Sequence, residues 1–293
     1  MRNRKQQYFC NFCQKRFQLK GWGKPKQKEG LIREYAIGKQ TQEQIGHKIG
    51  RSRKWVNQYL SKEVFFEGNY NATIIPQEIV LIVDTTYFEQ FGLMVFRASN
   101  LKKNLLWYAV KHETNEQYKE GIELLLGKGW KIKILIADGK PGLGKLFPDI
   151  PFQHCQFHLF QIVTRYISKK PKLLAGKELR EIMFRLKETD KESFEYWIGQ
   201  WYKKWKVFLS EKTENIGTGT KVFTHQRIRQ AYRAIVRTIP FLFTCYQFLP
   251  LEIYDSTTNS LDGYFSHLKS KLAVHRGASK STQIKLIYSL IFS

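Results

Sequence analysis

The chain has 293 residues, and its 49 Lys and Arg against 25 Asp and Glu give a formal net charge of +24 at pH 7. Apolar residues make up 42% of it, enough for a packed core, and a chain of this length corresponds to about two domains. No apolar run reaches the roughly 18 residues of a membrane span, and the polar start lacks the apolar stretch of a secretory signal, so we expect a cytoplasmic, nucleoid-associated protein with no membrane partner. The basic residues are spread over the whole chain, which favours nucleic acid as the partner over a membrane surface. A basic protein with no polyanionic partner is the alternative.

Residues 1–28 are polar and basic and contain Cys10 and Cys13 in a Cys-x-x-Cys spacing. Two thiolates at this spacing supply half of the four ligands that a structural zinc site requires. The segment therefore predicts a partial zinc ribbon followed by a linker. Four cysteines in a chain of this length are too few for a disulfide framework, which fits a reducing compartment.

Residues 29–66 have the sequence signals of short helices. Thr41 and Gln44 form a capping-box pattern, Gly50 ends that helix, and Ser52 can cap the next one. The second helix has a basic and amide outer face. This combination predicts a helix-turn-helix DNA-binding domain, with an ordinary helical hairpin as the alternative. The residues expected to contact DNA are Arg51, Ser52, Arg53, Lys54 and Asn57.

From residue 74 the pattern changes to strands. Apolar or β-rich runs cover 79–83, 93–98 and 105–110, a helical pattern covers 115–126, and another apolar run covers 132–136. This order predicts an α/β fold with a mixed sheet, the opening of a ribonuclease-H-like fold. Residues 152–157 are a candidate fifth strand.

From about residue 159 to 245 the chain is predicted to be mostly helical. Trp197, Trp201 and Trp205 recur on one helical face and are expected in a core. Four arginines between 224 and 237 fit either a phosphate track or a solvated face; they are Arg227, Arg229, Arg233 and Arg237.

Three carboxylates are candidates for chemistry. Asp84 and Asp138 each follow an apolar run, so we expect them side by side at the edge of the sheet, where they repel unless a cation lies between them. Mg²⁺ suits such a site because it binds one or two carboxylates together with water and phosphate oxygens. Asp262 lies near the start of a helix whose basic end is suited to phosphate. The basic residues of that end are Lys269, Lys271, His275 and Arg276.

Several motifs together resemble those of the Mutator-like transposases of bacterial insertion sequences, in the variant group with an N-terminal zinc-binding segment. They lie at residues 83–86, 136–139, 155–158, 257–269 and 275–277. The resemblance implies a catalytic domain over 74–293 with a helical insertion at about 159–255. It implies metal-dependent DNA cleavage and strand transfer by Asp84, Asp138 and Asp262 with Mg²⁺ or Mn²⁺, supported by Cys155 and His158. The implied partners are the terminal inverted repeats, target DNA and further copies of the chain.

The chain departs from this family at two places. The family's third acid is normally Glu, and the shorter Asp262 draws the carboxylate back by about one methylene. Because misplacement by about 1 Å can cost on the order of 100-fold in rate, a catalytically decayed transposase or a DNA-binding regulator is the alternative function. The relatives also carry two Cys-x-x-Cys pairs, whereas this chain has only Cys10 and Cys13, so either the reading frame begins upstream or the zinc site is incomplete.

Overall fold

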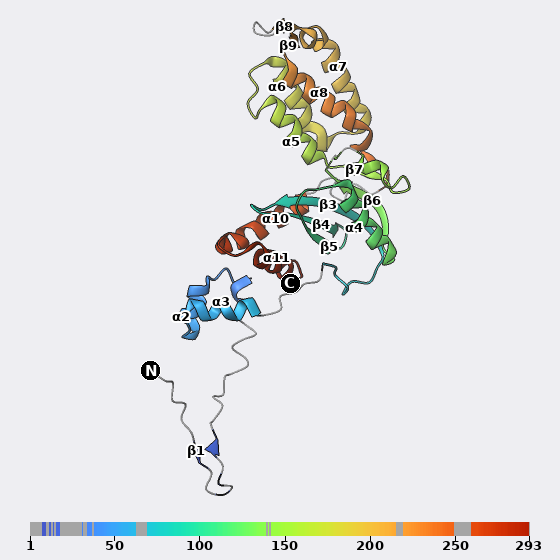
Figure 1. The fold of residues 1–293 in the computed structure, drawn as a ribbon. Helices are drawn as coiled ribbons and strands as arrows, with labels where there is room; N and C mark the ends of the chain where they lie inside the picture. The colour runs from blue at the N-terminus through green and yellow to red at the C-terminus, as the bar shows by residue number, and fades with distance from the viewer. Residues whose placement is uncertain are drawn as a thin grey trace. The chain divides into compact units, whose positions relative to one another are not determined.

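The computed structural model describes residues 8–9, 12, 14, 16–17, 31, 34–36, 38–62, 69–138, 140, 142–214, 219–248 and 259–292, and Figure 1 labels its elements. The chain divides into two compact units. The N-terminal unit comprises residues 1–64 and 274–276, and the C-terminal unit comprises residues 65–273 and 277–293. None of the described helices is both long and apolar enough to cross a membrane.

The first complete helix of the N-terminal unit, α2 (Gln42–Ile49), has both predicted ends. The Thr41 hydroxyl accepts the Gln44 N–H at 3.2 Å, and the Gln44 side chain accepts the Thr41 N–H at 2.8 Å. Gly50 ends the helix with a φ of 65°, a left-handed conformation that costs glycine little. The predicted capping box and glycine stop are confirmed.

Helix α3 (Arg53–Lys62) follows after a short turn. The Ser52 hydroxyl accepts the Trp55 N–H at 3.2 Å, which confirms the predicted cap. Val56 and Leu60 are buried, so α3 packs through the predicted apolar face. Within the same unit, α2 and α3 pack against each other.

The first elements of the N-terminal unit are two short antiparallel strands, β1 (Tyr8–Phe9) and β2 (Arg16–Phe17). The predicted zinc ligands Cys10 and Cys13 lie outside the described residues.

A five-stranded mixed sheet forms the centre of the C-terminal unit. Its strands run in the order β5-β4-β3-β6-β7, with β5, β4 and β3 antiparallel and β3, β6 and β7 parallel. Helix α4 (Asn115–Gly127) follows β5 and precedes β6. This strand order confirms the predicted ribonuclease-H-like α/β fold. The strands are β3 (Glu78–Tyr87), β4 (Gly92–Ala98), β5 (Lys103–Val110), β6 (Lys131–Ala137) and β7 (Phe152–His154).

Two strands differ from the prediction. β3 does not stop at Val83 but continues to Tyr87, because its antiparallel pairing with β4 extends beyond its parallel pairing with β6. β7 is shorter than predicted and ends at His154, after which Gln156 begins a helix.

Different helices cover the two faces of the sheet. The apolar face of α4 packs with Val83 and its same-face neighbours in one core cluster. Helices α10 (Asn259–Leu272) and α11 (Lys280–Phe292), red in Figure 1, contact β3 and β5 respectively. The Tyr288 hydroxyl of α11 accepts the Ala109 N–H at 3.1 Å.

The helical insertion has its own core. The residues of this core are contributed by α5 (Gln156–Ile167), α6 (Leu174–Phe184), α7 (Lys191–Ser210) and α8 (Gln226–Thr238). The indole N–H of the buried Trp201 donates to the Ala175 carbonyl at 3.0 Å. Trp197 and Trp205 pack partly buried against the same cluster, so the predicted tryptophan face is confirmed.

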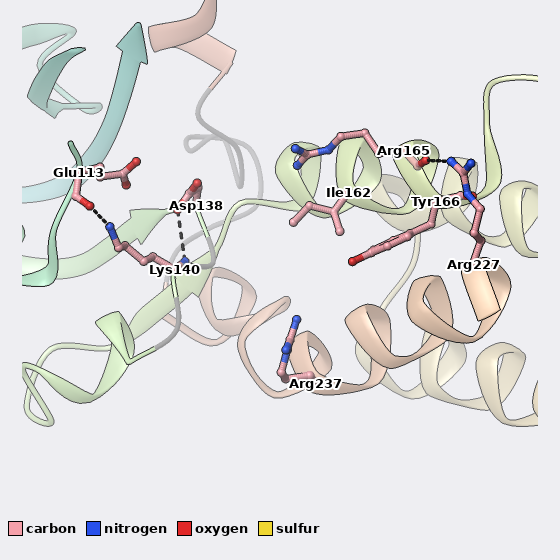
Figure 2. A pocket seen from close by; sticks show the side chains of 8 residues that line it. All are labelled: Glu113, Asp138, Lys140, Ile162, Arg165, Tyr166, Arg227 and Arg237. Carbon is pink, nitrogen blue, oxygen red and sulfur yellow. Dashed lines mark hydrogen bonds between the residues drawn. The ribbon is translucent and has the colours of Figure 1, made fainter. Parts of the chain in front are cut away.

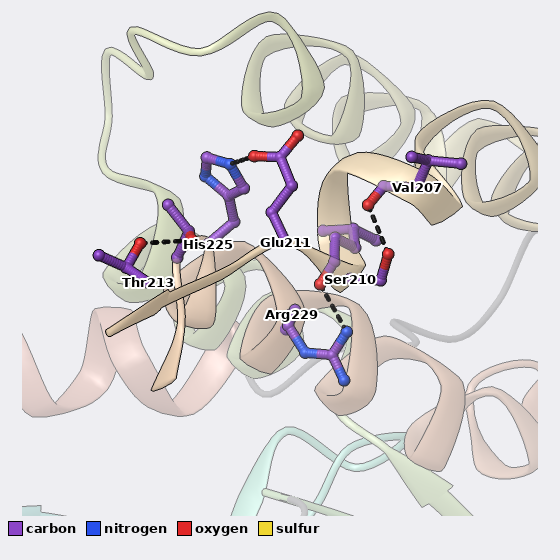
Figure 3. Close-up of polar contacts among 8 residues, drawn as sticks. Val207, Ser210, Glu211, Thr213, His225 and Arg229 are labelled. Atoms are coloured by element: carbon purple, nitrogen blue, oxygen red, sulfur yellow. Dashed lines mark hydrogen bonds and ion pairs between the residues drawn. The ribbon is translucent and has the colours of Figure 1, made fainter. Parts of the chain in front are cut away.

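A short hairpin interrupts the insertion where only helices were predicted. Strands β8 (Lys212–Glu214) and β9 (Lys221–Phe223) pair between α7 and α8. His225 forms a hydrogen bond with Glu211 at 2.9 Å (Figure 3), and Arg229 donates to the Leu209 carbonyl at 2.7 Å. The hairpin is too short and too exposed to show an alternation of apolar and polar residues, so no local pattern predicts it.

The insertion is joined to the sheet by buried amides. The Gln153 side chain of β7 accepts the Cys245 N–H at 3.0 Å and donates to the Leu242 carbonyl. The Gln156 amide donates to the same Leu242 carbonyl at 3.0 Å. Cys245 belongs to the short helix α9 (Thr244–Phe248), so this chain segment returns from the insertion directly to the end of β7.

Candidate active site

The register of the two central parallel strands places Asp84 beside Asp138. Val83 on β3 pairs with Ala137 on β6, and an aspartate follows each of them. Side chains alternate between the faces of a strand, and Val83 and Ala137 both pack in the core on the α4 side. Asp84 therefore points to the opposite face of the sheet, the face that α10 and α11 cover.

The third predicted acid, Asp262, lies in the first turn of α10, and α10 contacts β3. The apolar stripe of this helix is buried, and its residues are Leu261, Phe265, Leu268 and Leu272. Asp262 is half-buried on a neighbouring face, and its Oδ2 is buried without a hydrogen-bond partner among the described residues. An unpartnered buried carboxylate oxygen is costly, and a cation removes that cost.

Cys155 and His158 lie at the same edge of the sheet. The Cys155 N–H donates to the Ala137 carbonyl at 2.8 Å, which fixes the end of β7 beside the end of β6. Helix α5 starts at the next residue, so His158 lies in its first turn. Burial lowers the pKa of His158, but its hydrogen bond with Cys155 and the charges of Cys155, Asp84 and Asp138 outweigh burial and raise the pKa to about 9.

The carboxylates influence one another's ionisation. Burial raises the pKa of Asp84 to about 7, and the charges of Asp262 and Asp138 add to this shift. The charge of His158 and the hydrogen bond from the Thr85 N–H, at 2.8 Å, oppose it. Burial also raises the pKa of Asp262, against the charges of His158 and Lys269. Ionised Asp84 is therefore disfavoured chiefly by burial and to a lesser degree by the neighbouring acids, and a cation at this edge would offset both.

The donor set fits a divalent cation in its chemistry. Carboxylate oxygens are the ligands that Mg²⁺ prefers, and the buried Oδ2 of Asp262 has no other partner among the described residues. Among those same residues, no three His, Cys, Asp or Glu side chains are grouped tightly enough to enclose an ion. The charges of Asp138 and Asp262 both act on Asp84, so the three acids belong to one electrostatic site.

A fourth acid, Glu113, was missed by the sequence analysis. It is half-buried between β5 and α4, and its carboxylate accepts the Tyr118 hydroxyl. The Lys140 ammonium donates to the Glu113 carbonyl, while the Lys140 N–H donates to Asp138 Oδ1 at 3.2 Å. Burial raises the pKa of Glu113, and the charge of Asp138 contributes to that shift. No local motif marks Glu113, because it reaches this edge only through the packing of the β5–α4 turn.

A cavity of about 710 Å³ lies beside Asp138, and Figure 2 shows the side chains that line it. Its lining from the sheet edge is Glu113, Asp138 and Lys140, and its lining from α5 and α8 is Ile162, Arg165, Tyr166, Arg227 and Arg237. The wall at the sheet edge therefore carries two acids and a lysine, and the wall from α5 and α8 carries three arginines.

The four arginines of α8 have different surroundings. Arg227 donates to the Tyr166 and Arg165 carbonyls at 2.9 and 2.7 Å, at the end of α5. Arg229 lies over the Phe223 ring with its guanidinium carbon 3.6 Å from the centroid. These two brace the insertion, and Arg227 also lines the cavity. Arg233 and Arg237 are exposed, and of this pair Arg237 lines the cavity and Arg233 does not.

The predicted DNA-contacting residues of the N-terminal unit lie around the α2–α3 turn. Arg53 and Lys54 are exposed in the first turn of α3. Arg51 lies over the Trp55 ring at 5.3 Å from its centroid, and Asn57 accepts the Gln42 amide at 3.2 Å. Ser52 is exposed, but its hydroxyl caps α3.

Of the residues predicted for the basic end of α10, Lys269 and Lys271 lie in this helix, whereas His275 and Arg276 come after its end at Leu272. Lys269 and Arg276 are exposed, and Lys271 is half-buried. His275 is buried, with its ring centroid 4.1 Å from that of Tyr35, and its Nε2 has no partner among the described residues. Burial lowers the pKa of His275, so it is a neutral packing residue and we remove it from the expected DNA surface.

Comparisons with known proteins give distant structural similarity alone. No family model and no curated protein matches the chain. The chain is similar to the Drosophila P element transposase strand transfer complex, with a TM-score of 0.42 and 10% identity over 90% of this chain and 91% of the other. It is also similar to a simian T-cell lymphotropic virus intasome in complex with PP2A regulatory subunit B56 gamma, with a TM-score of 0.23 and 11% identity over 55% of this chain and 69% of the other. The assignment to the Mutator-like group stays a prediction from the motifs.

Proposed function

We propose that the chain is a DDE-type transposase that cuts DNA at the ends of an insertion sequence and joins them to target DNA. The observation that carries the proposal is the register of Val83 with Ala137, which places Asp84 and Asp138 side by side. The helix that bears Asp262 covers the same face of the sheet. This arrangement suits metal-dependent phosphodiester chemistry.

Asp84, Asp138 and Asp262 are the proposed ligands of Mg²⁺ or Mn²⁺. These residues would hold the ions, whose Lewis acidity would activate the attacking oxygen and stabilise the leaving 3′-oxygen. His158 is protonated at neutral pH, since its pKa is raised to about 9, and it offsets part of the negative charge of the acids. Cys155 positions His158 through their hydrogen bond.

The DNA partners are the terminal inverted repeats and the target duplex. The exposed Arg53 and Lys54 of α3 are the proposed contacts of a helix-turn-helix, and Lys269, Lys271 and Arg276 are further proposed phosphate contacts. Two ends must be joined in one event, so a homo-oligomer on DNA is part of the proposal. Zinc at Cys10 and Cys13 is a separate proposal that depends on further ligands.

A second candidate function is a DNA-binding regulator derived from a decayed transposase. The shortened third acid favours it, as does the lack, among the described residues, of a group of acids close enough to enclose an ion. It predicts binding to the element ends without cleavage.

The decisive experiment is a cleavage and strand-transfer assay in Mg²⁺ and in Mn²⁺ on the inverted repeats that flank the gene. The native chain is expected to nick and join these ends. Asp84→Asn and Asp138→Asn are expected to lose more than about 100-fold in rate. Asp149→Asn is the matched control, because it removes the same charge from an exposed position. Cleavage that survives in Asp84→Asn would refute the mechanism, and binding without cleavage in the native chain would favour the regulator.

A further inference from the structure

The cavity beside Asp138 has the chemistry of a nucleotide site. Its volume of about 710 Å³ is in the usual range of small-molecule pockets. It is too small for a duplex, whose major groove alone is about 12 Å wide. A single nucleotide that has left the base stack is of the right size.

The basic wall of this cavity is suited to a phosphate. Arg165 on α5 and Arg237 on α8 are both exposed and both line the cavity. The Lys140 ammonium, by contrast, donates to the Glu113 carbonyl on the opposite wall. Arg165 and Arg237 are therefore the charges best placed for an incoming phosphate, and guanidinium groups suit phosphate oxygens.

The same wall offers a surface for a base. Tyr166 is partly buried against the core of the insertion, and Figure 2 shows its ring between α5 and α8, facing the space into which Arg237 also projects. Ile162, one turn earlier on α5, adds apolar surface. Arg227 holds the Tyr166 and Arg165 carbonyls, so the end of α5 that carries both side chains is fixed to α8.

We propose that this cavity binds one unpaired nucleotide of the DNA strand adjoining the phosphodiester at Asp138, with its base against Tyr166 and its phosphate at Arg165 and Arg237. The inference rests on the proposed function and adds to it a preference for DNA that is locally unpaired at the cleavage position. Stacking on aromatic side chains tolerates any base, so the site selects an unpaired conformation and not a sequence.

The test is a binding measurement in which no cleavage can occur. The protein carries Asp84→Asn, since Asp84 does not line the cavity, and the buffer contains EDTA. The probes are an element-end duplex with one unpaired 2-aminopurine at the cleavage position and the same duplex fully paired. We expect tighter binding of the unpaired probe, and a change in 2-aminopurine fluorescence as its base contacts Tyr166.

The variants separate the site from general charge. Tyr166→Ala and Arg237→Ala are expected to lose roughly 10-fold in affinity for the unpaired probe, with little change for the paired one. Tyr166→Phe keeps the ring and is expected to keep the preference. Arg233→Ala is the matched control, because it removes an exposed arginine of the same helix that does not line the cavity.

Equal affinity for the two probes, or a preference that survives in Tyr166→Ala, would overturn the proposal. Thermal melting of each variant shows whether it is folded. If Tyr166→Ala is unfolded, Tyr166→Phe is used to decide the role of the ring. The readout is binding, so the result can be interpreted even if the native chain cuts no DNA. The proposed catalytic function and the nucleotide site can thus fail separately.

Discussion

Asp84 pairs with Val95 of β4 in the antiparallel ladder, although its parallel neighbour strand β6 has already ended its pairing with β3 at Ala137. The backbone of Asp84 is therefore paired with β4 on one side and unpaired on the side of β6. Asp138, which follows Ala137, lies on that unpaired side. Backbone pairing therefore holds Asp84, and Asp138 follows directly on the last paired residue of β6.

Stability without metal should depend on the ionisation of Asp84. Its pKa is raised from 3.8 to about 7 in the folded chain, so the folded state favours the protonated acid. The stabilising contribution is complete below pH 3.8 and is lost as the pH rises through about 7, at about 1.4 kcal/mol for each unit of difference. Asp84→Asn should remove this dependence, so its advantage in free energy of unfolding over the native chain should grow between pH 4 and 7.

Urea unfolding of both proteins across this pH range measures the difference. Added Mg²⁺ should stabilise the native chain and have a smaller effect on Asp84→Asn. A difference between the two proteins that stays constant from pH 4 to 7 would contradict the raised pKa.

Lengthening the third acid should increase activity. The Oδ2 of Asp262 is buried and unpartnered among the described residues, and Glu would extend the carboxylate by one methylene. If the present reach is short by about 1 Å, Asp262→Glu should raise the cleavage rate by up to about 100-fold. Single-turnover cleavage in Mg²⁺ measures it, with Asp262→Asn as the inactive control. A slower Asp262→Glu would mean that the site is built for the shorter acid.

Much of the sheet and its acids could be predicted from the sequence, because they depend on local patterns. The apolar run before Asp84 and the capping boxes are visible in short windows of sequence. The continuation of β3 past Val83 was not visible, since it requires β4 as a partner. Glu113 was missed and His275 was misjudged for the same reason. Asp138 acts on Glu113 and Tyr35 packs against His275, and each of these partners is distant in the chain.

The packing of α4 on the sheet should depend on one glycine. A Cβ at Gly121 would overlap the Phe96 ring, so Gly121→Ala should destabilise the C-terminal unit by about 1–3 kcal/mol. Gly199, within α7, has nothing within 4 Å of its added Cβ, so Gly199→Ala should stabilise by up to about 1 kcal/mol. Chemical denaturation of the two variants compares them directly. Equal effects of the same sign would show that helix propensity outweighs the contact with Phe96.

The N-terminal unit should account for part of the salt dependence of DNA binding. Arg53 and Lys54 are exposed at the start of α3, and replacing both by Ala should lower affinity and reduce the slope of log affinity against log salt by roughly 2 if each contacts one phosphate. Lys48→Ala is the control, because the Lys48 ammonium is paired with Glu34 at 2.6 Å. Titration of the element ends at several salt concentrations gives the slopes. An unchanged slope in the double variant would remove α3 from the DNA surface.

The cavity beside Asp138 is lined by two parts of the chain with different constraints. Its acidic residues belong to the sheet edge, where Asp138 follows the last residue of β6, while Arg165, Tyr166 and Arg237 project from helices that pack in the core of the insertion. Substitutions at these helical positions change neither the ladder nor the carboxylates. If the protein acts as proposed, relatives that differ at these helical positions differ in the DNA flank that they tolerate and keep the same metal-binding acids.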